Sequence, residues 1–164
     1  MSGAGGAGFR VGIGYDSHRL AAGRRLILGG VEIPFELGLD GHSDADALTH
    51  AVTDAVLGAA GAGDIGTHFP PDDERWRDAD SIELLRAVAQ RLEGRTVNVD
   101  ATVICERPKL GPYREEMERL LGEALGAPVS VKATTNEGMG AIGRGEGIAA
   151  MAVALFEPLD APSQ

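Results

Sequence analysis

Residues 9–16 alternate between apolar side chains and polar or small ones, which is the period of a β-strand with one buried face. We expect a first strand here whose apolar side chains face the core: Phe9, Val11, Ile13 and Tyr15. Side chains two apart on a strand project to the same side. Asp16 and His18 therefore form a pair of potential metal ligands if the strand continues.

Five later runs have strand patterns: 25–29, 31–35, 96–105, 129–134 and 148–156. The first two flank a Gly-Gly pair that is typical of a hairpin or a bulge. The last run is apolar throughout, which predicts a strand buried on both faces. Before it, residues 136–147 contain five glycines and interrupt the pattern.

Three runs have the 3.6-residue period of amphipathic helices, at about 44–60, 81–94 and 112–126. In the first, the Ser43 hydroxyl is the expected N-cap, with the Asp46 carboxylate in the first turn. Pro112 suits the start of the third helix, and Gly126 suits its end.

This order of elements has neither strict strand–helix alternation nor an internal repeat, so it predicts an α+β fold, a mixed α/β two-layer arrangement. Helices are expected on one face of a mixed β-sheet. We expect a single catalytic domain at 9–157, with tails at 1–8 and 158–164.

Composition and charge narrow the function classes. The 164 residues carry a net charge of −10, which disfavours nucleic-acid and anionic-membrane surfaces because both require basic patches. Cys105 is the only cysteine, so no intramolecular disulfide forms, which fits a reducing cytoplasm. Neither a membrane-spanning run nor a targeting peptide is expected, and we place the protein in the cytoplasm.

Candidate metal ligands come from the first strand and the first helix. Asp16, His18 and His50 offer one carboxylate oxygen and two imidazole nitrogens, a set typical of a catalytic zinc with an open fourth position. His42 and Asp46 are candidates for orienting ligands or contacting a substrate. The alternative is a solvated helix start with an incidental histidine.

A second polar cluster follows two later strands, at 108–111 and 132–137. Hydroxyls, backbone amides and the Glu137 carboxylate there could hold a diphosphate with a hard divalent ion such as magnesium. Alternatively, Thr134 and Thr135 are ordinary strand residues and Glu137 is solvated. Arg144 and Glu146 could likewise be a surface ion pair.

These motifs, taken together and in order, closely resemble the 2-C-methyl-D-erythritol 2,4-cyclodiphosphate synthase family of the non-mevalonate isoprenoid pathway. The resemblance runs from about Phe9 to Phe156 and rests on five segments: GYDSHR around Asp16, HSDADALTH from His42 to His50, GDIG at 63–66 followed by Phe69-Pro70, KATT at 132–135 with Glu137, and GRGEG at 143–147.

The resemblance implies a phosphorus–oxygen lyase that converts 4-diphosphocytidyl-2-C-methyl-D-erythritol 2-phosphate into the 2,4-cyclodiphosphate and releases CMP. It also implies Zn²⁺ or a similar transition metal, a second ion that is Mg²⁺ or Mn²⁺, and a homotrimer with sites between neighbouring subunits.

Individual roles follow from the same resemblance. Asp16, His18 and His50 look like the zinc ligands, and Glu137 like a ligand of the second ion. His42 and Thr135 match catalytic positions. The matching substrate contacts are Ser43, Asp46, Asp64, Gly66, Phe69, Asp73, Cys105, Pro108, Lys109, Leu110, Gly111, Thr134 and Arg144.

Two other functions remain open on the residues alone. A zinc-dependent phosphohydrolase would use the same ligands with water as its nucleophile. A non-catalytic trimeric isoprenoid-binding protein would rest on the glycine-rich loop around Arg144. Some relatives have an aromatic residue where this chain has Ala141, so the resemblance does not extend an isoprenoid site to this chain.

Overall fold

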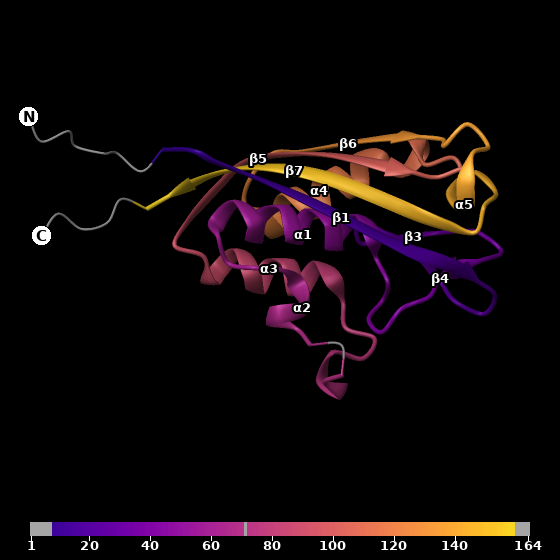
Figure 1. Cartoon of the computed structure of the whole chain (residues 1–164), viewed down its shortest axis with the longest axis horizontal. Helices are drawn as coiled ribbons and strands as arrows, with labels where there is room; N and C mark the ends of the chain where they lie inside the picture. The colour runs from indigo at the N-terminus through magenta and orange to yellow at the C-terminus, as the bar shows by residue number, and fades with distance from the viewer. Residues whose placement is uncertain (1–7, 71, 160–164) are drawn as a thin grey trace, which may run out of the picture.

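A computed structural model describes residues 8–70 and 72–159 and places a five-stranded sheet over a layer of helices (Figure 1). The strand order is β4–β1–β7–β5–β6. The strands span Arg10–Ala21 (β1), Gly38–Leu39 (β4), Gly94–Ile104 (β5), Val129–Thr134 (β6) and Gly147–Pro158 (β7). β7 is antiparallel to β1 and to β5, whereas β5 and β6 are parallel, so the predicted mixed sheet is confirmed.

The three long helices lie on one face of this sheet, as expected for a two-layer fold (Figure 1). They span Ala47–Ala60 (α1), Ser81–Arg91 (α3) and Arg114–Leu125 (α4). Shorter helical turns are found at Ile65–His68 (α2), Glu74–Trp76 (η1), Gly111–Tyr113 (η2) and Gly140–Gly143 (α5). The main hydrophobic core lies between the sheet and these helices.

The predicted hairpin is present as β2 (Leu26–Leu28) and β3 (Val31–Ile33), with Leu28 opposite Val31. Gly29 and Gly30 connect them with φ angles of +57° and +76°. Both angles are positive, as a two-residue type I′ turn requires, and glycine adopts them without steric cost.

The prediction for the buried face of β1 is wrong. Gly12 and Gly14 face α1, and a Cβ atom at Gly14 would lie 1.9 Å from the Ala51 carbonyl oxygen. The helix therefore packs directly on the strand backbone, which is possible because glycine has no Cβ atom. Close packing of backbone overrides the hydrophobic alternation from which the face was predicted.

The apolar residues of β1 instead lie on the opposite face of the sheet, which none of the three long helices covers (Figure 1). Ile13 pairs with Val153 and Tyr15 with Met151 on β7, so their side chains form one apolar surface. We call it the open sheet face, and its strongly exposed members are Val11, Ile13, Tyr15, Met151 and Val153. The expectation that β7 is buried on both faces is therefore wrong for the single chain, because Met151 and Val153 are 43% and 46% exposed.

The start of the first helix also differs from the prediction. α1 begins at Ala47, and its N-cap is Asp46, whose carboxylate accepts a hydrogen bond from the Thr49 amide. Ser43 lies in an irregular segment before the helix, where Ala45 has a φ of +55°. Gly126 ends α4 in the left-handed conformation, as predicted.

The predicted tails, 1–8 and 158–164, fall almost entirely outside the described residues. β1 begins at Arg10 and β7 ends at Pro158, close to the expected limits of the folded part. The described part of the chain contains no helix with the length and apolar character needed to cross a membrane.

Candidate active site

The three predicted zinc ligands meet at the junction of β1 and α1. Asp16 Oδ2 lies 2.9 Å from His18 Nε2 and 3.0 Å from His50 Nδ1, and the two imidazole nitrogens are 3.4 Å apart. Within the described residues, these donor atoms form a group that could hold a metal ion, and we call the three side chains the metal cluster. The positions of the ligands along strand and helix thus predicted that these three side chains meet.

The backbone fixes the orientation of one of these imidazoles. His18 Nδ1 lies 2.9 Å from the Asp40 carbonyl oxygen, which can only accept, so Nδ1 carries the proton and donates it. When the ring is neutral, its lone pair therefore lies on Nε2, the atom that faces Asp16 and His50. A metal-binding histidine is usually held in this way by a hydrogen bond at its other nitrogen.

Charge within the cluster also favours a cation. Burial alone would raise the pKa of Asp16, but hydrogen bonds and charges from His18 and His50 hold that pKa far below its usual range. Burial alone would lower the pKa of His18, but Asp16 and the Asp40 carbonyl raise it. The three side chains stabilise positive charge at this point, and one oxygen with two nitrogens fits the donor preference of Zn²⁺.

A cavity of about 300 Å³ opens beside the cluster, and His18 and His50 form part of its wall. His42 and Ser43, which were predicted to contact substrate, line the same cavity, together with Ile65, Gly66, Phe69, Trp76 and Leu84. The Ser43 hydroxyl lies 3.2 Å from His50 Nε2. The irregular segment before α1 therefore presents His42 and Ser43 next to the metal cluster.

Asp46 is not part of this cavity, and its predicted contact with substrate is contradicted because its side chain is fully buried. Its two oxygens accept hydrogen bonds from the amides of Gly29, Gly30 and Thr49 and from the Thr49 hydroxyl, at 2.7–2.9 Å. Burial and the charge of Asp44 raise the pKa of Asp46, although these donors oppose the shift. Asp46 is an N-cap that joins α1 to the β2–β3 turn.

A loop after α1 closes another side of the cavity. The Ile65 amide donates to Asp54 Oδ1 at 2.7 Å, which ties this loop to α1. Asp64 caps α2 by accepting from the amide and the hydroxyl of Thr67, and Gly66 lies on the cavity wall. The structure thus places the predicted contact Gly66 on the cavity wall with the histidines, whereas the predicted contact Asp64 caps α2 without lining the cavity.

The predicted contacts Phe69 and Asp73 occupy the next segment, in which Pro71 lies outside the described residues. Phe69 is 6% exposed and packs edge-on against Trp76 with ring centres 4.9 Å apart. The Asp73 carboxylate caps η1 and pairs with Arg75, while its carbonyl oxygen lies 3.4 Å from His42 Nε2. Asp73 therefore contacts His42 through its backbone.

The second predicted cluster forms a separate cavity of about 470 Å³ between the ends of β5 and β6. Six predicted substrate contacts and the predicted catalytic Thr135 line it; the six are Cys105, Pro108, Lys109, Leu110, Gly111 and Thr134. Burial raises the pKa of the Cys105 thiol to about 11. The Thr135 hydroxyl lies 3.2 Å from Glu137 Oε1, so the predicted ligand of the second ion is adjacent to this cavity.

This second cavity shares no lining residue with the cavity beside the metal cluster. Glu137 likewise is not in the group formed by Asp16, His18 and His50. Arg144 lines a third cavity, of about 540 Å³, and pairs with Glu146 at 2.7 Å. A single chain therefore brings its predicted site residues together as separate groups.

Two neighbours of the metal cluster were not among the predicted site residues. Ser81 Oγ lies 2.9 Å from His50 Nε2, and its hydroxyl also contacts the Asp44 carboxylate. Ser81 appeared in the sequence only as a helix start, and 31 residues separate it from His50. Because contacts between such distant positions depend on tertiary packing, hydrophobic periodicity carries no signal for them.

Comparison with known proteins places the chain among closely similar sequences. The model of the YgbB family matches residues 9–157. A 2-C-methyl-D-erythritol 2,4-cyclodiphosphate synthase from Gloeobacter violaceus is 58% identical over 159 residues, covering 93% of this chain and 98% of the relative. One from Symbiobacterium thermophilum is 61% identical over 152 residues, covering 89% and 97%.

Solved structures agree with the architecture. The bifunctional IspDF of Campylobacter jejuni superposes with a TM-score of 0.88 at 37% identity, over 93% of this chain and 43% of that larger chain. The CDP complex of IspF from Plasmodium falciparum superposes with a TM-score of 0.80 at 32% identity, over 94% of this chain and 99% of that one.

Proposed function

The chain belongs to the YgbB family, and we propose that it converts 4-diphosphocytidyl-2-C-methyl-D-erythritol 2-phosphate into 2-C-methyl-D-erythritol 2,4-cyclodiphosphate and CMP. The proposed reaction is an intramolecular phosphoryl transfer that serves the non-mevalonate isoprenoid pathway. The observation that carries it is the cluster of Asp16, His18 and His50 at the wall of a cavity that also presents His42 and Ser43.

The residues fit the chemistry of this reaction. The substrate's 2-phosphate oxygen attacks the β-phosphorus, and the bond to the CMP oxygen breaks. Because the nucleophile is already an anion, the protein must supply alignment and positive charge rather than a general base. A zinc ion held by Asp16, His18 and His50 would act as a Lewis acid on the β-phosphate.

The chain's own residues divide this task. We assign His42 and Ser43 to hold the methylerythritol 2-phosphate, because both line the cavity next to the metal cluster. The backbone contact between His42 and Asp73 holds the imidazole at that wall. Phe69 and Trp76 pack against each other on the cavity wall, where their rings would keep water from a bound substrate.

We assign the cytidine diphosphate part of the substrate to the second cavity, lined by Cys105 through Gly111 and by Thr134 and Thr135. Lys109 supplies a cation there, and the Thr135 hydroxyl, which donates to Glu137 in the free chain, would turn to a phosphate oxygen when substrate binds. Glu137, beside Thr135, would hold a magnesium or manganese ion that neutralises the diphosphate. Bound cations would let a chain with net charge −10 bind this polyanion.

We further propose a homotrimer in which the metal cavity of one subunit meets the cytidine cavity of its neighbour. Two observations support it: the cavities share no lining residue, and the open sheet face exposes apolar side chains. Ile13 is 65% exposed and Val153 46%, and cross-strand apolar patches of this kind mark protein interfaces. Assembly would complete the site and cover that face.

Two further parts of the proposal concern extent and location. A single main core between the sheet and α1, α3 and α4 supports one catalytic domain at 9–157. The single buried thiol of Cys105 supports a reducing cytoplasm as the place of reaction.

The direct test is to incubate purified protein with the cytidylylated substrate, with and without a chelator, and to identify products by mass. We expect CMP and the cyclic diphosphate without chelator and neither with it. A hydrolysed, open diphosphate would instead support the zinc-dependent phosphohydrolase. Binding of isoprenoids without turnover would support the non-catalytic alternative.

Variants connect this test to the site. His50→Ala is expected to lose zinc and CMP release together. His68→Gln is the matched control, because His68 Nε2 contacts the Ala62 carbonyl oxygen rather than the metal cluster, and glutamine retains a donor. Normal metal content and normal CMP release in His50→Ala would refute the assignment.

The trimer is tested separately. Ile13→Glu adds a charge to a side chain that is 65% exposed in the single chain, so it should leave the subunit folded but prevent assembly. Leu159→Glu, at a side chain 70% exposed outside the open sheet face, is the control. Sedimentation of Ile13→Glu as a trimer would show that the open sheet face is not the interface.

A further inference from the structure

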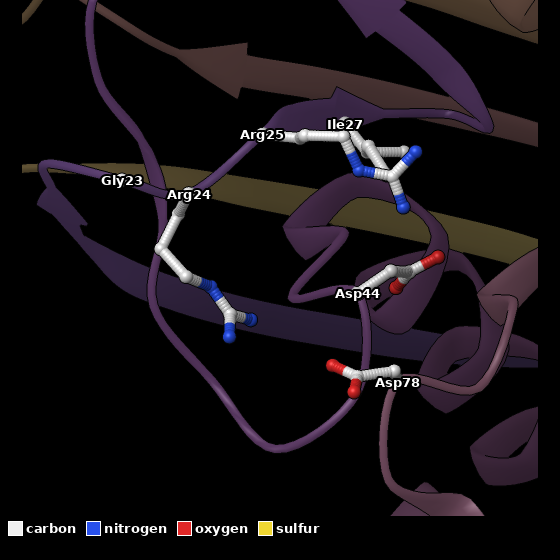
Figure 2. Close-up of a pocket in the computed structure, with 6 residues that line it drawn as sticks. All are labelled: Gly23, Arg24, Arg25, Ile27, Asp44 and Asp78. Carbon is white, nitrogen blue, oxygen red and sulfur yellow. The ribbon is translucent and has the colours of Figure 1, made fainter.

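Asp44 and Ser81 lie behind the metal cluster, on the side of His50 away from Asp16. Ser81 is the first residue of α3 and is 1% exposed, whereas Asp44 belongs to the irregular segment before α1. The Asp44 amide donates to the Ala79 carbonyl at 3.3 Å, and the Ser81 amide donates to Asp44 Oδ2 at 2.9 Å. Figure 2 shows Asp44 beside Asp78, which belongs to the segment leading into α3.

The direction of each hydrogen bond in this group follows from its chemistry. An ionised carboxylate has only acceptor sites, so the Ser81 hydroxyl donates its proton to Asp44 Oδ1. That proton is then not available to His50, and Ser81 Oγ presents lone pairs to His50 Nε2 at 2.9 Å. His50 Nε2 therefore carries the proton and donates it to Ser81.

This arrangement determines which nitrogen of His50 can bind a metal. With the proton on Nε2, the lone pair of a neutral imidazole lies on Nδ1, the atom 3.0 Å from Asp16 Oδ2. The opposite tautomer would place a proton where a metal must bind. Asp44 thus acts on the cluster through Ser81, across three hydrogen-bonded groups.

We propose that Asp44 and Ser81 are positioning residues that hold His50 as an Nδ1 metal ligand, with the Asp44 carboxylate fixing the direction of the hydrogen bonds. The inference deepens the proposed function, because it concerns the metal site on which that function rests. It makes a separate claim, since metal affinity can be measured without turnover.

Ser43 is the competing partner for His50 Nε2, at the longer distance of 3.2 Å. Its hydroxyl oxygen also accepts from the Ala45 amide at 3.3 Å, and Ser43 lies on the cavity wall, where a substrate would contact it. The two hydroxyls differ because that of Ser81 donates to the Asp44 carboxylate, which leaves its oxygen to accept from His50. If Ser43 held the ring instead, Asp44 would have no influence on the metal.

Zinc affinity of the folded protein, measured by competition with a chromophoric chelator, tests the inference. Ser81→Ala is expected to weaken zinc binding by about 10- to 100-fold, the usual effect of removing a group that orients a ligand. Ser81→Thr should restore most of the affinity because it keeps the hydroxyl. Asp44→Asn should weaken binding to a similar degree, because its amide can donate to Ser81 and reverse the hydrogen bonds.

The double variant Asp44→Asn/Ser81→Ala separates a connected pair from two independent structural losses. Residues that act through one chain of hydrogen bonds are non-additive, so the double variant should bind zinc about as weakly as Ser81→Ala alone. The absorption spectrum of the cobalt-substituted protein should also change in both single variants. Ser130→Ala, an exposed hydroxyl on β6, is the control and should match the wild type in both measurements.

Wild-type zinc affinity in Ser81→Ala, or additive losses in the double variant, would overturn the inference. A larger loss in Ser43→Ala than in Ser81→Ala would assign the role to Ser43 and overturn it as well. These results are distinct from a failure of the proposed function. In that case the wild type would release no CMP, yet Ser81→Ala would still bind zinc more weakly.

Discussion

The contact between β1 and α1 gives the sharpest test of how the fold positions the metal ligands. Asp16 and His18 lie on β1, and His50 lies on α1, so the distance between the two elements sets the size of the cluster. Gly14 lies at this contact: a Cβ atom there would be 1.9 Å from the carbonyl oxygen of Ala51, the residue that follows His50.

The magnitude for Gly14→Ala follows from this distance. Ordinary contact begins at about 3.4 Å, so strand and helix must separate locally by about 3.4 − 1.9 = 1.5 Å. The obstacle is backbone and cannot rotate away, which places the cost at or above the upper end of the ~1–3 kcal/mol typical of overpacking. For a chain of this length, about 3 kcal/mol corresponds to a loss of about 6–12 °C in Tm.

The same separation should widen the metal cluster. Asp16 Oδ2 and His50 Nδ1 are 3.0 Å apart, and a shift of about half that distance would disrupt a shared coordination geometry. We therefore expect Gly14→Ala to lower zinc affinity by at least about 10-fold in the protein that remains folded. Circular dichroism during urea and thermal unfolding gives the stability, and chelator competition gives the affinity.

Gly58→Ala is the matched control, because it lies on the same helix and near the same strand. A Cβ atom at Gly58 would be 3.8 Å from the Ile13 carbonyl oxygen, an ordinary contact. Since alanine favours a helix over glycine, Gly58→Ala should stabilise the protein by about 0.5–1 kcal/mol. A Tm for Gly14→Ala within about 1 °C of the wild type would refute the claim that β1 and α1 are in backbone contact.

Three further predictions use other parts of the structure. Asp46→Asn should lower the free energy of unfolding by about 3 kcal/mol in urea titrations, because an amide cannot accept from all four surrounding donors; an unchanged value would contradict the buried cap. Cys105 has its pKa raised to about 11 from 9.0, so it should react slowly with iodoacetamide at pH 8, and rapid alkylation of folded protein at that pH would contradict this. The contribution of its protonated thiol to stability should be complete below pH 9 and lost as pH rises through 11. Arg24 donates to the carbonyls of Leu39, Gly41 and Ser43 at 3.0–3.2 Å beside a cavity of about 210 Å³ (Figure 2). Arg24→Ala should therefore slow CMP release with normal zinc content, and millimolar guanidinium should partly restore the rate. Arg25→Ala, whose side chain is 70% exposed, is the control, and an unaffected rate in Arg24→Ala would contradict the role.

The elements that were predicted well are those whose signals are local. The strand at Val129–Thr134 and the hairpin turn at Gly29–Gly30 depend on residues within a few positions, and both were predicted where they occur. The metal cluster was also predictable, because Asp16 and His18 on one strand and His50 on a helix give the donor set that zinc prefers. The family resemblance supplied the remaining site residues.

The errors share a different physical cause. The alternation at residues 9–16 was assigned to a strand with its apolar side inward, but the glycines of β1 admit the helix backbone and the apolar side faces outward. Asp46 was predicted to orient a ligand or to contact substrate, the latter from the family resemblance, yet the buried amides of the β2–β3 turn hold it. Both depend on contacts between elements, which a one-dimensional pattern does not encode.

The corrected face of β1 links the fold to the proposed activity. One strand carries the apolar side chains of the open sheet face and, three residues after Ile13, the first metal ligand Asp16. Because strand side chains alternate, packing glycines against α1 places the metal cluster on the helix side and leaves the apolar residues free for a neighbouring subunit. If the apolar side chains of β1 faced α1 and the glycines faced outward, the apolar residues would be buried, and α1 could not come close enough to bring His50 to Asp16. The glycines of β1 therefore determine assembly and metal binding together, and Gly14→Ala should weaken zinc binding while leaving the open sheet face apolar.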